Sequence, residues 1–233
     1  MNHIIETWLE KGIGQKIFLL RHGEIQGADG EKRFIGQTDV LLSERGRHQA
    51  IWWRQRLADV SLARILSSDL GRCTETAKII ADRRGVAVEA LSGLREILLG
   101  RWEGMSFRRV KERWPSAFQR RGLNLARFRP PDGESFKDLQ QRVIRCFEDV
   151  INQAAFPILI VAHAGVNRMI LCHVLKIPIE SMFCIAQHYG GMNIINCKDR
   201  TYRVQAMNLI PPPENKMVSS TTTHCPSAAR CFR

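Results

Sequence analysis

The first residues able to do chemistry are Arg21, His22 and Gly23, which directly follow the apolar run at residues 17–20. Such a short apolar run predicts a buried strand, and open α/β sheets bind ligands at the carboxyl ends of their strands. Arg21 could hold phosphate oxygens in a forked grip, while Gly23 permits a sharp turn that leaves His22 facing the phosphorus. The alternative is a partly buried histidine bonded to a carbonyl group.

A second buried-strand pattern, Ile158–Ala162, ends in the same way, because His163, Ala164 and Gly165 follow it directly. Runs of aliphatic and β-branched residues are typical of strands that are covered on both faces. Two histidines therefore stand at two strand ends of one chain, which favours a shared site over coincidence.

Two further candidates lie between these histidines. Arg72 follows a short strand pattern at residues 65–66 and falls in the first turn of an expected helix, where free N–H groups and the helix dipole attract anions. Glu96 precedes a loop with glycines on both sides, Gly100 and Gly104, which could bring a carboxyl group into a cleft. Taken alone, Glu96 would be interpreted as a surface acid.

The elements that must position these residues alternate between strand and helix, which predicts an α/β fold. The helix after Gly133 is marked best, with Ser135 as N-cap, Asp138 three residues later and apolar positions at spacings of three and four. The other expected helices follow Ser43, cover residues 70–81 and run through Met169 and Leu175. The remaining expected strands are residues 86–88 and a hairpin that joins residues 193–197 to 202–207.

Composition indicates a folded protein with an anionic ligand. The chain has 233 residues, 44% hydrophobic and 25% charged, and its net charge is +12. Residues 101–129 hold nine basic residues against two acidic ones, more than half of that excess. The segment is interpreted either as a solvated helical face or as a basic cap over an anion pocket.

Several classes of protein are disfavoured. The longest apolar run has seven residues, far below the roughly 20 that span a bilayer, and the N-terminus lacks a signal-peptide pattern. Seven scattered cysteines without a C-x-x-C pair predict reduced thiols in a cytoplasm and no metal site. We expect one domain over residues 16–210 with a cap insertion at about 101–132, a lead-in at 1–15 and a disordered tail at 211–233.

Taken in order, these motifs strongly resemble the histidine phosphatase superfamily, the phosphoglycerate-mutase-like proteins, over roughly residues 16–208. The resemblance implies a three-layer α/β/α sandwich with a mostly parallel mixed sheet, and no cofactor or metal. It implies that His22 is the nucleophile and becomes phosphorylated, and that Glu96 is the proton donor. It assigns the phosphoryl oxygens to Arg21, Arg72 and His163, and we expect His163 to be protonated beside the charge of those oxygens. Substrate contacts are expected from Gly23, Gly36, Gln37, Ala164 and Gly165.

The implied chemistry is physically reasonable. A phosphomonoester dianion repels anionic nucleophiles, so a neutral imidazole that nearby arginine charge keeps unprotonated is a suitable attacker. Cationic groups around the equatorial oxygens supply the electrostatic stabilisation on which phosphoryl transfer depends. Glu96, beside a bound dianion, would keep its proton until the leaving group needs it. Cys73, next to Arg72, could be mistaken for a nucleophile and is expected to be structural.

The reaction is predicted to be hydrolysis, with mutase chemistry as the alternative. The interval from Glu96 to His163 is shorter than in the cofactor-dependent mutases. The segment that begins at the second histidine also resembles the phosphatase branch, with the sequence His163-Ala164-Gly165-Val166-Asn167-Arg168. Two short segments, Gly36-Gln37-Thr38-Asp39 and Leu42-Ser43-Glu44-Arg45-Gly46, resemble the α-ribazole phosphatases, which implies a role in the assembly of the cobalamin lower ligand. Residues 25–28 depart from the usual first motif; Gln37 could replace the amide missing there or could be a turn residue.

The predicted partner is a small phosphorylated substrate, with no membrane partner and no nucleic acid. A non-catalytic binder of nucleic acid or phosphorylated partners is the alternative of another class, since the basic segment could contact phosphates. That alternative does not explain two strand-end histidines, and the segment carries no recognised nucleic-acid motif. The sequence leaves the oligomeric state open.

Overall fold

A mixed six-stranded sheet forms the centre of the computed structural model, which describes residues 15–28, 30–153 and 155–213. Its strands are β1 (Gln15–Arg21), β2 (Arg64–Ser68), β3 (Val88–Leu91), β4 (Ile158–Ala162), β5 (Met192–Lys198) and β6 (Thr201–Leu209). They lie in the order β3-β2-β4-β1-β5-β6. The first four strands in this order run parallel to one another, and β5 runs antiparallel to both of its neighbours, β1 and β6. The mostly parallel mixed sheet is confirmed.

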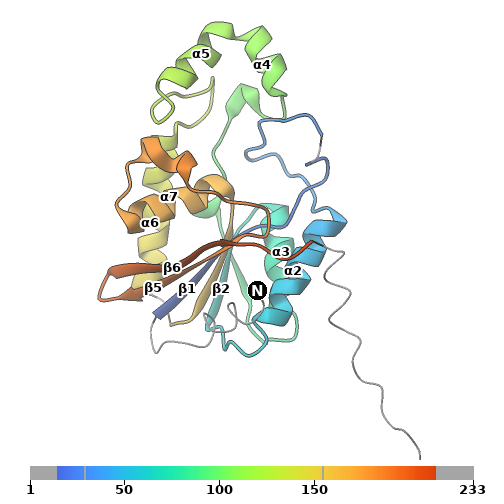
Figure 1. Cartoon of the computed structure of the whole chain (residues 1–233), viewed down its shortest axis with the longest axis vertical. Coiled ribbons are helices and arrows are strands. Elements are labelled where there is room, and N and C mark those ends of the chain that lie inside the picture. The colour runs from blue at the N-terminus through green and yellow to red at the C-terminus, as the bar shows by residue number, and fades with distance from the viewer. Residues whose placement is uncertain (1–14, 29, 154, 214–233) are drawn as a thin grey trace, which may run out of the picture.

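The side chains of β1 show why this strand lies at the centre. Ile17 and Leu19 are buried in one hydrophobic core, and Phe18 and Leu20 are buried in the core on the opposite face. Helices α6 and α7 cover the first face, and α2 and α3 cover the second (Figure 1). The predicted three-layer sandwich is therefore confirmed. The α-helices are α2 (Glu44–Arg56), α3 (Gly71–Ala81), α4 (Phe107–Arg113), α5 (Pro115–Leu123), α6 (Phe136–Asn152) and α7 (Ala164–Leu175).

Side-chain caps fix where two of the helices begin. The Ser43 hydroxyl accepts a hydrogen bond from the Gly46 backbone at the start of α2. At the start of α6, Ser135 and Asp138 form the reciprocal capping box that their spacing predicts. The apolar face of α6 is then aimed at the sheet, with Leu139 and Val143 fully buried. Three short 3₁₀ helices, η1 (Ser92–Leu94), η2 (Gly100–Trp102) and η3 (Ile179–Cys184), connect the longer elements.

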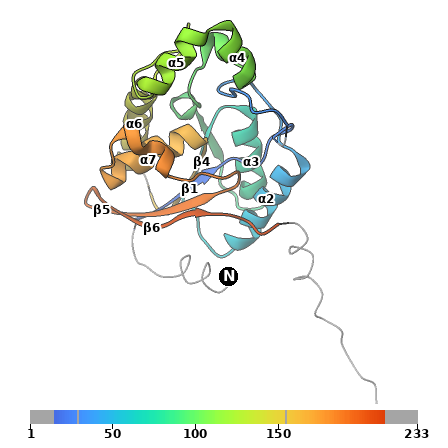
Figure 2. The ribbon, with the colours of Figure 1, turned by 45° about the horizontal axis from the view of Figure 1, so that its top comes forward.

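The basic insertion forms a separate lobe, called the cap below (residues 101–132). Its helices α4 and α5 lie apart from the sheet, at the top of both views (Figures 1 and 2). Trp102, Val110 and Ala117 are buried and join the cap to the core that lies under α6 and α7. Eight of its nine basic side chains are exposed, as a solvated face requires, and Arg121 is the exception.

Two sequence expectations need comment. The strand expected at residues 86–88 instead spans Val88–Leu91, because the pairing with β2 begins only where Val88 lies opposite Ile65. The hairpin is present and extends to Leu209. Most of the expected lead-in and tail lies outside the described residues, so both stay predictions. Within the described part of the chain, every helix is too short or too polar to cross a bilayer.

Candidate active site

Four predicted site residues meet at one edge of the sheet. Because Arg21 pairs with Ala162 across the parallel β1–β4 ladder, His22 and His163 leave the sheet side by side. Their ring centroids are 5.1 Å apart. Arg72 approaches from the first turn of α3 and is almost completely buried, as are both histidines. We call Arg21, His22, Arg72 and His163 the histidine cluster.

The backbone determines the form of the His22 ring. Its Nδ1 lies 2.7 Å from the Gly23 carbonyl oxygen, which can only accept a hydrogen bond. Nδ1 therefore carries the proton, and Nε2 is left with a free electron pair. Burial, and then the charges of Arg21 and Arg72, lower the pKa of His22 well below its ordinary value of 6.5. The ring is a neutral potential nucleophile, as the sequence predicts.

The two arginines are held by backbone carbonyl groups, which leaves their charges without a carboxylate partner among the described residues. Arg21 donates to the Gln187 carbonyl at 2.8 Å, and its guanidinium lies 3.6 Å from the centre of the Tyr189 ring. Arg72 donates to the carbonyl groups of Gly36 and Thr38. The Nε atoms of both arginines are buried and lack a hydrogen-bond partner within the described part of the chain. The site thus offers donors suited to an oxyanion.

His163 is buried beside a hydroxyl group and two arginines. Its Nε2 lies 2.9 Å from the Ser68 hydroxyl. Burial, followed by the neighbouring His22 and Arg72, lowers the pKa of His163 well below its ordinary value. In the site without a ligand this shift favours a neutral His163 ring, and the protonated form expected beside a bound phosphoryl group stays a prediction. A bound dianion would act in the opposite direction.

Glu96 is a site residue and not a surface acid. It is 8% exposed and comes from the segment between η1 and η2. One carboxylate oxygen accepts from the Gly165 backbone N–H at 2.9 Å, and the other accepts from that of Ile97. The first bond ties Glu96 to the start of α7, directly after His163. The proton donor that the resemblance implies thus lies beside the histidine cluster.

The expected substrate-binding residues have different positions. A methyl group on Gly23 would collide with the Gly46 backbone, one on Gly36 with the Ile97 carbonyl, and one on Gly165 with Glu96. These glycines are explained by close packing. Ala164 lines the cavity beside Arg21. The Gln37 amide donates to the Glu96 carbonyl at 3.0 Å, so it supports the Glu96 segment.

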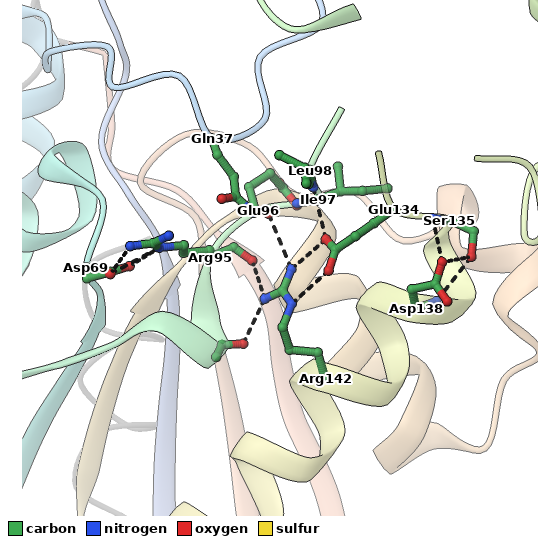
Figure 3. A network of polar contacts seen from close by, with 11 residues as sticks. Gln37, Asp69, Arg95, Glu96, Ile97, Leu98, Glu134, Ser135, Asp138 and Arg142 are labelled. Atoms are coloured by element: carbon green, nitrogen blue, oxygen red, sulfur yellow. Dashed lines mark hydrogen bonds and ion pairs between the residues drawn. The ribbon is translucent and has the colours of Figure 1, made fainter. Parts of the chain in front are cut away.

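Arg142 supports the Glu96 segment from α6, and no sequence motif marked it. Figure 3 shows its guanidinium between the Glu134 carboxylate, bound at 2.8 and 3.0 Å, and the carbonyl groups of Gly93, Arg95 and Glu96. The planar guanidinium of Arg142 thus donates to three carbonyl groups of the segment at residues 93–96. The network holds Glu96 in place through the backbone.

Other supporting residues also escaped sequence reasoning. Glu103 accepts from the backbone N–H groups of Gly36 and Thr38, the two residues whose carbonyl groups hold Arg72. Gln187 and Tyr189, which hold Arg21, follow η3 in a stretch without a catalytic motif. Cys73 is fully buried, and burial raises the pKa of its thiol, which fits a structural role.

Comparison with known proteins agrees with this geometry. Residues 17–210 match the family model described as "Histidine phosphatase superfamily (branch 1)". The chain belongs to the histidine phosphatase superfamily. A glucosyl-3-phosphoglycerate phosphatase of Mycolicibacterium vanbaalenii is 32% identical over 175 residues, covering 72% of this chain and 77% of that protein. A Salmonella arizonae protein named "Probable phosphoglycerate mutase GpmB" is 33% identical over 168 residues, covering 70% and 76%.

Solved structures give the same class. An α-ribazole phosphatase of Shigella flexneri superposes with a TM-score of 0.78 at 28% identity, covering 85% of this chain and all of that one. A mycobacterial glucosyl-3-phosphoglycerate phosphatase solved with VO3 gives a TM-score of 0.74 at 27% identity, covering 83% of this chain and 98% of that one. The named phosphatases and the family together make this protein a hydrolase of the phosphatase class.

The buried histidines predict a pH-dependent stability. Because both pKa values are lowered on folding, the unfolded chain binds more protons below pH 6.5, and stability falls as the pH decreases. At pH 5.5 each buried histidine should lower the free energy of unfolding by roughly 1 kcal/mol relative to pH 7.5. Urea unfolding in phosphate-free buffer measures this loss of stability.

His163→Gln should remove about half of the stability loss between pH 7.5 and pH 5.5. His188→Gln changes an exposed ring and should leave the loss unchanged. Equal pH dependence in all three proteins would contradict the assignment.

The packing of Gly165 against Glu96 gives a second prediction. Gly165→Ala should displace the carboxylate and lower kcat for a phosphomonoester by roughly 100-fold, within the range that general acid–base catalysis contributes. The matched control is Gly122→Ala in α5, where an added methyl group meets no atom within 4 Å among the described residues. Steady-state kinetics with p-nitrophenyl phosphate measures both variants. If Gly165→Ala is as active as Gly122→Ala, the position of the Glu96 carboxylate does not matter for catalysis.

Proposed function

We propose that the protein is a metal-independent phosphomonoesterase that works through a phosphohistidine on His22. One observation carries the proposal: the Gly23 carbonyl holds the proton of His22 on Nδ1, which leaves Nε2 unprotonated between two arginines that lack carboxylate partners among the described residues. An anion bound by those arginines would place its phosphorus in front of the free electron pair.

In the first step, Nε2 of His22 attacks the phosphorus and the bond from phosphorus to the ester oxygen breaks. Glu96, in its protonated form, gives its proton to the departing oxygen. In the second step, water attacks the phosphohistidine and gives a proton to the Glu96 carboxylate. The P–N bond breaks, its electron pair returns to Nε2, and inorganic phosphate leaves. Arg21, Arg72 and His163 contact the phosphoryl oxygens throughout.

Hydrolysis is favoured over mutase chemistry, although several sequence relatives carry the name "Probable phosphoglycerate mutase GpmB". A mutase must keep water from its phosphohistidine while the ligand turns, which requires a closed pocket. The interval from Glu96 to His163, which contains the cap, is short. A smaller cap favours hydrolysis, because it closes the site less completely against water. Phosphoglycerate mutase activity is the second candidate, and the experiment below separates the two.

The proposed substrate is a small phosphorylated metabolite. α-Ribazole 5′-phosphate is supported by structural neighbours named as α-ribazole phosphatases, and the sequence relative from Mycolicibacterium supports a glucosyl-3-phosphoglycerate. A screen of phosphorylated metabolites that includes both compounds is the direct way to choose. A role in cobalamin assembly and a cytoplasmic location stay predictions.

Substitution of His22 tests the proposal. His22→Ala should lower turnover of p-nitrophenyl phosphate by at least about 1,000-fold and abolish acid-labile phosphate labelling of the protein. The control is His188→Ala, which removes an exposed imidazole and should keep both properties. Undiminished turnover by the His22 variant would refute the proposal.

The wild-type protein with 3-phosphoglycerate distinguishes hydrolysis from mutase chemistry. If the proposal is right, phosphorus NMR should show any reacting phosphoryl group released as inorganic phosphate, because hydrolysis transfers it from His22 to water. Accumulation of 2-phosphoglycerate without free phosphate would establish the mutase instead.

A further inference from the structure

The second histidine of the cluster has a hydrogen-bond partner to which the mechanism above gives no part. His163 Nε2 lies 2.9 Å from the hydroxyl oxygen of Ser68, the last residue of β2. Because β2 pairs in parallel with β4, its last residue and the histidine that follows β4 leave the sheet at the same edge. Both side chains are almost completely buried. The pairing of the sheet therefore fixes the contact between them.

A serine hydroxyl can serve this ring in either of its protonation states. It has one proton to donate and two lone pairs with which to accept. The backbone N–H of Leu70 donates to Ser68 Oγ at 3.3 Å, which uses one lone pair. The hydroxyl proton and the second lone pair are left, so Ser68 can donate to an unprotonated Nε2 or accept from a protonated one.

Cys73 touches the same nitrogen but is a much weaker partner. Its Sγ lies 3.4 Å from His163 Nε2 and 3.4 Å from the Ala162 carbonyl oxygen. Burial raises the pKa of this thiol, so it stays uncharged, and a thiol sulfur accepts hydrogen bonds only weakly. Ser68 is therefore the stronger of the two acceptors for a proton on Nε2.

Titratable and charged groups surround His163 on several elements. They are Arg21 and His22 at the end of β1, Arg72 and Cys73 in α3, Glu96 in the segment between η1 and η2, and Arg142 in α6. Burial, the neighbouring His22 and the three arginines all lower the pKa of His163 in the site without a ligand. A bound phosphoryl dianion would oppose them, because its negative charge favours the protonated imidazole. Protonation then also requires an acceptor for the second N–H, since a buried donor without a partner is costly.

We propose that Ser68 is a positioning residue that enables His163 to bind a phosphoryl dianion as a cation, by accepting a hydrogen bond from Nε2 of the protonated ring. The inference rests on the proposed function, since it assumes that the dianion lies against the histidine cluster. In the site without a ligand, the Ser68 hydroxyl donates to Nε2 and the ring proton is on Nδ1. When the dianion binds, a proton from solvent joins Nε2, and the hydroxyl proton turns toward Cys73. The Nδ1–H group then donates to a phosphoryl oxygen.

Ser67 provides a matched control for the loss of the hydroxyl group. It precedes Ser68 in β2 and is just as buried, and its hydroxyl donates to the Ser68 carbonyl oxygen at 2.7 Å. Among the described residues it forms no hydrogen bond with either histidine of the cluster. Ser67→Ala therefore removes a buried hydroxyl from the same strand and leaves His163 Nε2 with its partner.

The protonation of His163 can be followed in the full-length protein labelled with ¹⁵N-histidine. The probe is sodium tungstate near pH 7.5, because tungstate is a tetrahedral dianion like the phosphoryl group and has no proton of its own to gain or lose there. Nitrogen chemical shifts in a long-range ¹H–¹⁵N spectrum distinguish a neutral ring from a doubly protonated one. His163→Gln identifies the signals that belong to this residue.

Tungstate at saturation should change His163 of the wild-type protein from one protonated nitrogen to two. In Ser68→Ala the ring should stay neutral, and tungstate should bind roughly 10- to 100-fold more weakly, the range of a hydrogen bond to a charged group. Ser67→Ala should match wild type in both measurements. Ser68→Thr keeps a hydroxyl group and should retain the second proton. A merely structural role for Ser68 would weaken binding without changing the protonation of the bound ring.

A neutral His163 in the wild-type tungstate complex, or a doubly protonated one in the Ser68→Ala complex, would overturn the inference. Ser68→Cys, which offers a weaker acceptor of similar shape, takes the place of Ser68→Ala with the same expectation if the alanine variant does not fold. Failure of the wild-type protein to bind tungstate would overturn the inference as well.

Hydrolysis of p-nitrophenyl phosphate, measured on the same wild-type protein, separates this inference from the proposed function. Protonation of His163 that depends on Ser68, without hydrolysis, would overturn the proposed function and support the role of Ser68. Hydrolysis together with a neutral His163 in the wild-type complex would overturn the role of Ser68 alone.

Discussion

The parallel pairing of β1 with β4 is the constraint on which the site depends. Because Arg21 lies opposite Ala162, the residues that follow these strands emerge together and two imidazoles are brought to 5.1 Å. A shift of register by one residue would send alternate side chains to the opposite face, and the cores on both faces resist such a shift. The packing of the continuous apolar run of β1 into both cores therefore sets the distance between the two imidazoles.

The second requirement is a positive field without protonated histidines. Arg21 and Arg72 are held through backbone carbonyl groups, so their charges remain available to a ligand. The same field, together with burial, keeps His22 unprotonated and able to attack. The carbonyl partners of Arg72 lie in the segment that Glu103 binds, so the position of the guanidinium depends on the cap as well as on the sheet.

Sequence reasoning succeeded where function depends on local chain geometry. Buried-strand ends and a helix start predicted the convergence of His22, His163 and Arg72, and the family resemblance added Glu96. It failed where the contact partner comes from a distant segment without a motif. Arg142 and Tyr189 illustrate this, since each acts through packing that only the folded chain creates. The low pKa of His163 in the site without a ligand was also beyond sequence reasoning, because burial depends on the whole fold.

The basic cap shows that net charge and function must be separated residue by residue. Three of its exposed arginines form surface ion pairs, whereas the half-buried Arg121 lies with its guanidinium 5.4 Å from the centre of the Phe34 ring. Charge density in a sequence predicts an anionic partner in general.

A crystal structure of the protein with orthovanadate would test the central claim most directly. Vanadate adopts the five-coordinate geometry of a phosphoryl group in transfer, so it should be found at covalent distance from Nε2 of His22. Its equatorial oxygens should contact Arg21, Arg72 and His163, with Glu96 near the apical oxygen opposite His22. Vanadate bound elsewhere, or bound here through a residue other than His22, would contradict the account.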